Sequence, residues 1–315
     1  MKEKIVVGID TSNYTTSIAI VNTDGELIAN IKRPLPVKPG ECGLRQSDAV
    51  FSHVKNIPSL MDEAEPFMAG RQIVAIGVSS KPRNVDGSYM PCFLSGLAAA
   101  KTLAAATNAP LFLFSHQCGH IMAALYSSGQ LSLYGSEFAA FHVSGGTTEL
   151  LHVRGNNDGF ETDIVGGTLD ANAGQIIDRI GVHLGMPFPA GPHIEKAALE
   201  FKGKIPRRKP SVRGTYINLS GLENMAKKIH SEFNDPSMTT AFLLDYIGNS
   251  ISTACNAYIS EYGDMPFIFA GGVMCNTIIR KKLENEFQAF FAEPLLSADN
   301  AVGIAVLALN SFLKK

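Results

Sequence analysis

The sequence predicts a mixed α/β protein made of two related halves. The chain has 315 residues, which exceeds the usual size of one domain and favours two. Residues 4–31 and 137–165 follow one pattern: an apolar strand, a small polar turn, a second strand, an Asp-Gly turn and a third strand. After each meander the pattern changes to helices and strand–loop–helix units, as in proteins whose helices cover their sheets.

In the first half, apolar residues at helical spacing predict a helix over residues 47–64, followed by a strand over residues 73–78. Residues 94–114 form the most apolar later stretch, but Lys101 and Asn108 interrupt it. We therefore expect a helix and then a strand there, and no membrane span.

In the second half, residues 266–270 predict a strand, Gly271 and Gly272 a tight turn, and residues 274–287 a helix. A last helix is expected over residues 301–312.

Hydrophobic residues make up 45% of the chain and charged residues 18%. This composition supports sizeable cores and excludes a disordered or fibrous protein.

Five widely spaced cysteines without a CxxC pair argue against a disulfide framework and fit a reducing compartment, so we expect a cytoplasmic protein. The formal net charge is -2, so any contact with nucleic-acid phosphates must come from a local patch. The segment Lys202–Arg213 is such a patch, because it carries six lysine and arginine residues. It contacts phosphates or is a solvated loop, and the sequence leaves both readings open.

Two turns are rich in hydroxyl, glycine or acidic residues, at residues 10–13 and 144–148, and a third, at residues 271–276, has a Gly-Gly pair before the start of a helix. Backbone amides in such turns receive phosphate oxygens, and glycine lets a ligand approach closely, so we expect a nucleotide there. Hairpins with Asp-Gly turns also arise by chance, but the shared polar turns argue for a true repeat. Asp178, on an expected helix before the turn that contains Gly191, accepts ribose hydroxyls or is merely solvated.

His116 and His120 stand four residues apart, so on a helix they share one face. Imidazoles suit zinc or iron(II), and Asp299, in a polar turn before the last helix, is our choice of third ligand. Two ordinary explanations stay open: the histidine pair is incidental, and Asp299 only caps the following helix. Gln117 stands where the HExxH motif has glutamate, so the usual general base of a metallopeptidase is absent.

Several motifs occur in the order and spacing of a known family, over nearly the whole chain. They are Gly8 to Ser12, the His116/His120 pair, Val143 to Thr148, Asp170 to Asp178, Pro189 to Pro192, Leu219 to Leu222, Gly271 to Asn276, and Asp299-Asn300. In these motifs the sequence resembles the tRNA threonylcarbamoyl-adenosine synthase family (TsaD/Gcp type), once described as O-sialoglycoprotein endopeptidases.

The resemblance implies a two-lobed α/β fold of the actin/Hsp70/sugar-kinase-like (ASKHA) type, with duplicated ribonuclease-H-like sheets. The expected lobes are residues 1–130 and 131–298, and a C-terminal helix, residues 299–315, is expected to pack back on the first lobe. The resemblance also implies one Fe or Zn ion, held by His116, His120 and Asp299.

By the same resemblance, Asp10 and Thr11 are expected to take part in catalysis. The expected nucleotide ligand is AMP, ATP or threonylcarbamoyl-adenylate, and a larger set of residues is expected to bind it. These residues are His142, Val143, Ser144, Gly145, Gly146, Asp178, Gly191, Glu195, Gly271, Gly272 and Asn276.

The implied reaction is the metal-dependent transfer of a threonylcarbamoyl group from its adenylate to N6 of the tRNA adenosine beside the anticodon. The implied partners are tRNA, in part through Lys202–Arg213, and the small homologous subunit and ATPase of the family complex. No membrane contact is expected.

Five positions lack an acid or a histidine that the family usually has: Tyr14, Thr15, Thr147, Ala171 and Gln175. These differences leave two alternatives open, a non-catalytic nucleotide-binding relative and a carbamoyltransferase with another acceptor. A small-molecule kinase on the same fold is a third alternative. It would use Asp10 as its base and depend on Mg²⁺ instead of the histidine pair.

Overall fold

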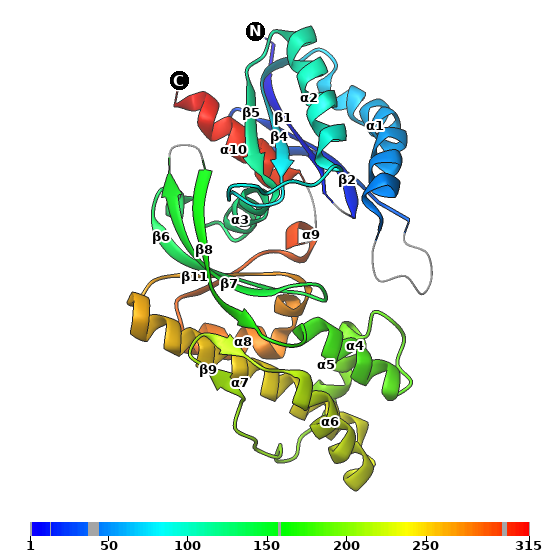
Figure 1. The fold of residues 1–315 in the computed structure, drawn as a ribbon, viewed down its shortest axis with the longest axis vertical. Helices are drawn as coiled ribbons and strands as arrows, with labels where there is room; N and C mark the ends of the chain where they lie inside the picture. Colours follow the sequence, from blue (N-terminus) through cyan, green and yellow to red (C-terminus); the bar gives the residue numbers. More distant parts are fainter. Residues whose placement is uncertain (1, 13, 37–43, 157–158, 298–300, 315) are drawn as a thin grey trace. The chain divides into compact units, whose positions relative to one another are not determined.

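The computed structural model describes residues 2–12, 14–36, 44–156, 159–297 and 301–314. Its internal contacts divide the chain into two compact units (Figure 1). Unit 1 comprises Met1–Gly135, Gly155–Glu161 and Leu295–Lys315, and unit 2 comprises Ser136–Arg154 and Thr162–Pro294. Each unit has its own sheet and its own helices, as the two meanders predicted.

The sheet of unit 1 has the strand order β3-β2-β1-β4-β5. Its strands are β1 (Lys4–Thr11), β2 (Thr15–Asn22), β3 (Leu27–Pro34), β4 (Gln72–Lys81) and β5 (Leu111–Ser115). The first three form the expected antiparallel meander, whereas β4 pairs in parallel with β1 and β5 in parallel with β4. The carboxyl ends of β1, β4 and β5 therefore meet at one edge, where ligands bind in open α/β sheets.

Helices cover both faces of this first sheet. They are α1 (Gln46–Met68), α2 (Phe93–Thr107), α3 (His116–Ser127) and α10 (Val302–Leu313), with a short 3-10 turn at Leu131–Leu133. On one face, Leu60 of α1 and Ala100 of α2 pack with Ile76 and Val78 of β4 in one hydrophobic cluster. The helices predicted over residues 47–64 and 301–312 are confirmed with ends shifted by a few residues, and the helix and strand expected within residues 94–114 are α2 and β5.

The C-terminal helix α10 lies on the opposite face of the first sheet, against glycines that alternate with the core residues. A Cβ atom on Gly8 would lie 2.6 Å from the Ala301 carbonyl oxygen, and one on Gly77 would lie 2.6 Å from that of Ile304. A Cβ on Gly303 would lie 1.9 Å from the carbonyl oxygen of Gly119 in α3. These glycines allow the backbones to approach closely, and α10 thereby supports both the sheet and α3.

The sheet of unit 2 has the order β12-β11-β6-β7-β8-β10-β9. Its strands are β6 (Glu137–Val143), β7 (Thr148–Asn156), β8 (Gly159–Thr168), β9 (Val212–Arg213), β10 (Tyr216–Ile217), β11 (Phe267–Ala270) and β12 (Ala289–Phe291). The second expected meander is β6-β7-β8, and β11 pairs in parallel with β6. The tip of the β7–β8 hairpin, Gly155–Glu161, belongs to unit 1.

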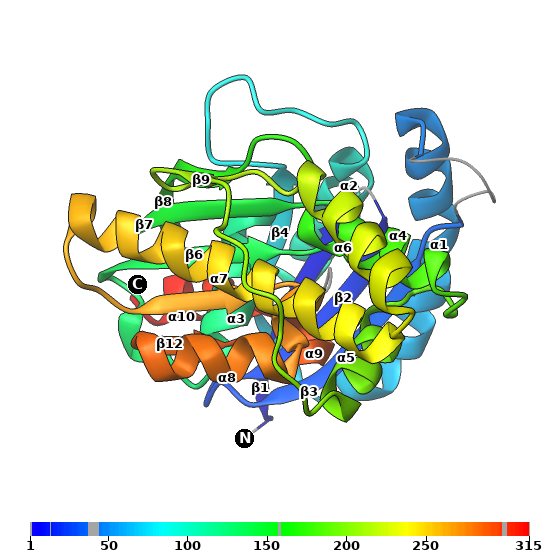
Figure 2. The same cartoon turned by 90° about the horizontal axis from the view of Figure 1, so that it is seen from below.

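The helices of unit 2 pack on one another: α5, α6 and α8 contact the long helix α7, which Figure 2 shows running beside α8, and α4 contacts α5 and α6. They are α4 (Ala173–His183), α5 (Gly191–Glu200), α6 (Ser220–Phe233), α7 (Pro236–Tyr262) and α8 (Thr277–Glu286), and the short α9 (Pro294–Ser297) follows at the border of the units. Although α7 has 27 residues, no helix in the described ranges is long and apolar enough to cross a bilayer.

One expected helix start was wrong. The prediction began a helix at Met274, but Gly272–Cys275 form a 3-10 turn and α8 starts at Thr277. The cause is Asn276, whose side-chain oxygen accepts hydrogen bonds of 3.1 Å from the backbone N–H groups of both Ile278 and Ile279. This N-cap fixes where the α-helix begins.

Candidate functional site

The histidine pair lies at the start of α3, with His116 as its first residue and His120 one turn later, so that both lie on one helical face. The hydroxyl of Ser115 caps this helix by accepting a 3.2 Å hydrogen bond from Cys118 N. The Nε2 atoms of His116 and His120 face each other at 2.9 Å, with the two rings arranged edge to face. The Nε2 atoms of both imidazole rings are therefore directed toward the same point.

Asp10, at the end of β1, determines which ring nitrogen of His116 carries the proton. Its side chain is fully buried, and its Oδ1 lies 2.9 Å from His116 Nδ1. Because a carboxylate only accepts hydrogen bonds, the imidazole must donate Nδ1–H. The lone pair of His116 is then left on Nε2, the atom that faces His120. A carboxylate behind a histidine in this way is a common arrangement around protein-bound metals.

The two imidazoles fit a shared metal ion. Nitrogens separated by 2.9 Å can both lie at the usual bonding distance of about 2.0–2.1 Å from one zinc ion. The expected third ligand, Asp299, lies outside the described residues. Among the residues that are described, no group of three His, Cys, Asp or Glu side chains forms a metal site. The sulfur of Cys118 instead contacts the Phe160 carbonyl oxygen at 3.5 Å.

Thr11, the other residue expected to act in catalysis, is fully buried next to Asp10. Its hydroxyl donates a 3.0 Å hydrogen bond to the Cys92 carbonyl and accepts one of 3.1 Å from Gly96 N. Thr11 therefore ties the end of β1 to the start of α2. Its role in catalysis stays a prediction.

In unit 2, a tight turn follows β6. Ser144 N donates to the Thr147 carbonyl at 2.7 Å, and Ser144 Oγ accepts from Thr147 N at 3.0 Å. Among the described residues other than their chain neighbours, no atom lies within 4 Å of the positions where Gly145 and Gly146 would carry a Cβ. The backbone of this turn is thus open on one side, as a turn that receives a phosphate must be. His142 and Val143, which precede the turn, form the end of β6.

The N-terminus of α4 abuts this turn. Gly174 N donates to the Ser144 carbonyl at 3.2 Å, and a Cβ on Gly174 would lie only 2.7 Å from Gly145 N. Only a residue without a side chain allows this approach. The amides at the start of α4 are therefore held beside the open glycines.

Two acidic side chains then connect α4 to α5 and α5 to α8. Asp178 Oδ1 accepts a 2.8 Å hydrogen bond from Ala190 N, just before Gly191, whose missing side chain leaves open space. Glu195 Oε1 accepts from Thr277 N at 2.8 Å and also from the Thr277 hydroxyl. Both carboxylates, expected to contact the nucleotide, each give one oxygen to the backbone at a helix N-terminus.

Gly271, which follows β11, packs against the residue before the Ser144 turn and so connects the segment before α8 to that turn. Its φ is +98°, and a Cβ there would lie 2.3 Å from the Val143 carbonyl oxygen, directly before the Ser144 turn. The next residue, Gly272, has open space where its side chain would be. We call these four connected segments the glycine ring: residues 142–147, 172–178, 190–195 and 271–277. It brings together the N-termini of α4, α5 and α8, and the positive ends of these helix dipoles favour an anion such as a phosphate.

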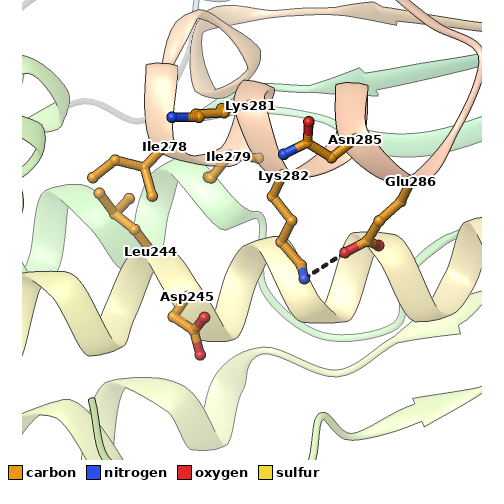
Figure 3. Close-up of a pocket in the computed structure, with 8 residues that line it drawn as sticks. All are labelled: Leu244, Asp245, Ile278, Ile279, Lys281, Lys282, Asn285 and Glu286. Atoms are coloured by element: carbon orange, nitrogen blue, oxygen red, sulfur yellow. Dashed lines mark hydrogen bonds and ion pairs between the residues drawn. The ribbon is translucent and has the colours of Figure 1, made fainter. Parts of the chain in front are cut away.

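A cavity of about 490 Å³, lined by residues of α4 and α6, includes Asp178 in its wall. It is lined by Asp178, Arg179, Val182, His183, Phe188, Glu223 and Lys227. The Lys227 ammonium bonds Glu223 at 2.6 Å and, with Arg179, lowers the pKa of that carboxyl below its ordinary value. Figure 3 shows a second groove, of about 450 Å³, between α7 and α8, and none of the eight residues drawn there belongs to the predicted site.

Sequence reasoning assigned no role to two polar residues that hold segments of the chain together. One is Asp170, whose carboxylate accepts from Leu219 N at 2.8 Å and Ser220 N at 3.0 Å, and so caps α6. Burial opposes its charge, but these hydrogen bonds together hold the pKa of Asp170 below its ordinary value. The other is His53, which is fully buried on α1. Asp170 and the Leu-Ser-Gly-Leu helix start that it caps are separated by 49 residues, so no local pattern linked them, and nothing in the local pattern distinguished His53.

Comparison with known proteins gives consistent results. Residues 39–306 match the family model "TsaD: tRNA N6-adenosine threonylcarbamoyltransferase". The enzyme of that name from Bacillus licheniformis is 30% identical, over 99% of this chain and 93% of its own length. The one from Bacillus anthracis is 32% identical, over 96% of this chain and 90% of its own length.

Solved structures share the fold at low sequence identity. Full-length HypF in its phosphate- and nucleotide-bound form has a TM-score of 0.60 and 11% identity, covering 99% of this chain and 56% of its own. A ROK family glucokinase from Streptomyces griseus has a TM-score of 0.53 and 13% identity, covering 96% and 99%. The expected actin/Hsp70/sugar-kinase-like fold is confirmed, and by sequence the chain belongs to the tRNA N6-adenosine threonylcarbamoyltransferase family.

Proposed function

We propose that this protein transfers a threonylcarbamoyl group from threonylcarbamoyl-adenylate to N6 of the tRNA adenosine beside the anticodon. The observation that carries the proposal is the array of Asp10, His116 and His120, in which one buried carboxylate aligns two imidazoles, in a chain of this family. This array supplies nitrogen ligands in the arrangement that metal-dependent transfer requires.

The glycine ring of unit 2 is proposed to bind the adenylate. Its open backbone at Gly145, Gly146, Gly191 and Gly272 and its three helix N-termini suit the phosphate of AMP. During transfer, the exocyclic amine of adenosine bonds to the carbamoyl carbon, and the bond from that carbon to the phosphate oxygen breaks. AMP then leaves as an anion that the positive ends of the helix dipoles at the ring stabilise, and the amine gives up its proton to water.

One Fe or Zn ion is proposed to be held by His116, His120 and Asp299. Such an ion, when bound, polarises a carbonyl oxygen of the donor. Asp10 keeps the proton of His116 on Nδ1 and so keeps Nε2 available as a ligand. The burial of Asp10 excludes water from this hydrogen bond, which makes the orientation of the ring well defined.

The segment Lys202–Arg213 is proposed to contact tRNA phosphates. Its cations are Lys202, Lys204, Arg207, Arg208, Lys209 and Arg213. Within the described ranges, none of these six forms an ion pair with a carboxylate of this chain, so their charges are available to an external polyanion. The small homologous subunit and the ATPase expected from the resemblance stay proposed partners.

The test is mass spectrometry of tRNA nucleosides after incubation of the protein with tRNA, threonylcarbamoyl-adenylate and Zn²⁺ or Fe²⁺. We expect adenosine to gain the mass of one threonylcarbamoyl group, and the gain to disappear in the variant His116→Ala. Turnover that is unaffected by this variant and by chelators would contradict the proposal.

The second candidate is a nucleotide-binding relative without transferase activity. Thr147 favours it, because this residue stands in the glycine ring where the family usually has histidine. That candidate predicts calorimetric binding of AMP or ATP with no modified adenosine in the same reconstituted reaction. Measurable turnover would exclude it.

A further inference from the structure

His53 is a fully buried polar side chain with no role in the transfer described above. Its Nε2 lies 2.8 Å from the Ser12 carbonyl oxygen, and its Nδ1 lies 2.8 Å from Thr16 Oγ1. A carbonyl oxygen only accepts, so Nε2–H donates to Ser12. In the neutral ring Nδ1 then accepts the hydroxyl hydrogen of Thr16.

The hydrogen bonds of this cluster are mutually consistent. Thr16 Oγ1, which donates to His53, accepts a 3.1 Å hydrogen bond from Asn56 Nδ2. Burial lowers the pKa of His53 below its ordinary value, against the opposing effects of the Ser12 hydrogen bond and the charge of Asp10. The neutral form, which this pattern requires, is therefore favoured.

The imidazole of His53 bridges the two strands of the β1–β2 hairpin at the end where the turn connects them. The last residues paired between β1 and β2 are Thr11 and Thr16, and Ser12 follows directly after β1. His53 thus holds the outgoing strand through Ser12 and the returning strand through Thr16. Asp10, which aligns His116, is only two residues before Ser12, and its own carbonyl accepts from the Ser17 hydroxyl at 3.4 Å.

We propose that His53 is a positioning residue for the histidine pair: by clamping the β1–β2 hairpin, it holds Asp10 where its carboxylate fixes the Nδ1 proton of His116. The bearing of this role on catalytic rate rests on the proposed function, but the geometric claim does not. A carboxylate shifted by about 1 Å would orient His116 poorly, and misplacements of that size cost enzymes about 100-fold in rate.

The direct test is NMR of the protein labelled with ¹⁵N only at histidine, without added metal. In the wild-type protein we expect a slowly exchanging Nδ1–H signal from His116, identified among the eight histidines by its loss in His116→Ala. The variant His53→Leu, which fills the site but cannot hydrogen-bond, should lose this signal. The variant His53→Gln should keep it, because its amide supplies both a donor for Ser12 and an acceptor for Thr16.

The matched control is His152→Leu in unit 2. His152 is also a buried histidine, with Nδ1 2.7 Å from the Tyr258 hydroxyl, and it lies away from the glycine ring. We expect it to lower the melting temperature about as much as His53→Leu while leaving the His116 signal intact. The proposal is overturned if His53→Leu keeps the signal, if His152→Leu also loses it, or if wild type lacks it.

Kinetics give a second readout. His53→Leu should lower kcat for transfer about 10- to 100-fold, as loss of outer-shell support does at metal sites, with KM for tRNA within about twofold. A KM change with kcat unaffected would argue against positioning. If wild type shows no transfer, the proposed function fails, whereas the NMR comparison still decides the role of His53.

Discussion

The two groups of candidate site residues differ in the chemical groups that form them. In unit 1, the array of Asp10, His116 and His120 depends on side chains, one of them a buried charge with a fixed partner. In unit 2, the glycine ring depends on backbone amides and on missing side chains, with Asp178 and Glu195 serving to hold helices together. Substitutions in the array should therefore act through the chemical identity of the side chain. Substitutions in the glycine ring should act through the volume of the added side chain and the backbone conformation that it allows.

The largest effect is expected from His116→Ala, which removes one of two facing nitrogens. We expect transfer to fall by more than about 100-fold, since the proposed metal ion would lose one of its ligands, and metal analysis should find the ion depleted. Cys118→Ser on the same helix is the control, because its sulfur contacts the Phe160 carbonyl and not the histidines. Equal loss in both variants would mean that α3 matters for folding and not for its imidazoles.

The next largest effect is expected from Asp10→Asn. An amide can present either oxygen or nitrogen to His116 Nδ1, so the proton of this ring is no longer fixed. Titration with Co²⁺, followed by its visible absorption, should show affinity reduced about 10- to 100-fold. Unchanged Co²⁺ affinity in a folded variant would show that the buried carboxylate does not support a metal site.

The glycine ring can be tested with two adjacent substitutions of identical chemistry. Gly271→Ala should destabilise the fold by about 1–3 kcal/mol or more, because φ is +98° and the new Cβ meets the Val143 carbonyl oxygen. Gly272→Ala has open space and should leave the melting temperature nearly unchanged. Calorimetry should nevertheless show AMP binding weakened about tenfold in Gly272→Ala, as a methyl group would obstruct a ligand lying on the backbone. Wild-type affinity there would place the nucleotide elsewhere.

The smallest effect concerns the cap that Asp170 provides to α6. Its pKa is lowered in the folded protein, so its contribution to stability is present above the unfolded pKa, ordinarily 3.8, and is lost as pH falls through the folded value. Asp170→Ala should cost about 1 kcal/mol at neutral pH, with the difference shrinking in acid. Asp170→Asn keeps a capping oxygen without titrating, and its denaturant midpoint should lack this acid-dependent loss. A cost for Asp170→Ala that is constant from pH 7 to pH 3 would contradict the assignment.

Local spacing predicted much of the site, because local chemistry builds those parts. The interval between His116 and His120 places both on one helical face, and the glycine pairs mark turns whatever the rest of the chain does. The start of α8 was predicted three residues early, since the capping role of Asn276 was not recognised. The carboxylates Asp178 and Glu195 each give one oxygen to a helix N-terminus, which the sequence did not indicate, and their contact with a ligand stays a prediction.

By itself, the sequence determined the two meanders, the α/β class and the residue types at each turn, since these follow from periodicity and backbone preferences over a few residues. Only the tertiary structure decided which side chains meet. Asp10 contacts His116 across 106 positions of sequence, and His53 reaches Ser12 across 41. Such contacts exist because sheet pairing and the close packing of α10 on glycines bring distant strand ends to one edge, and no local pattern encodes that approach.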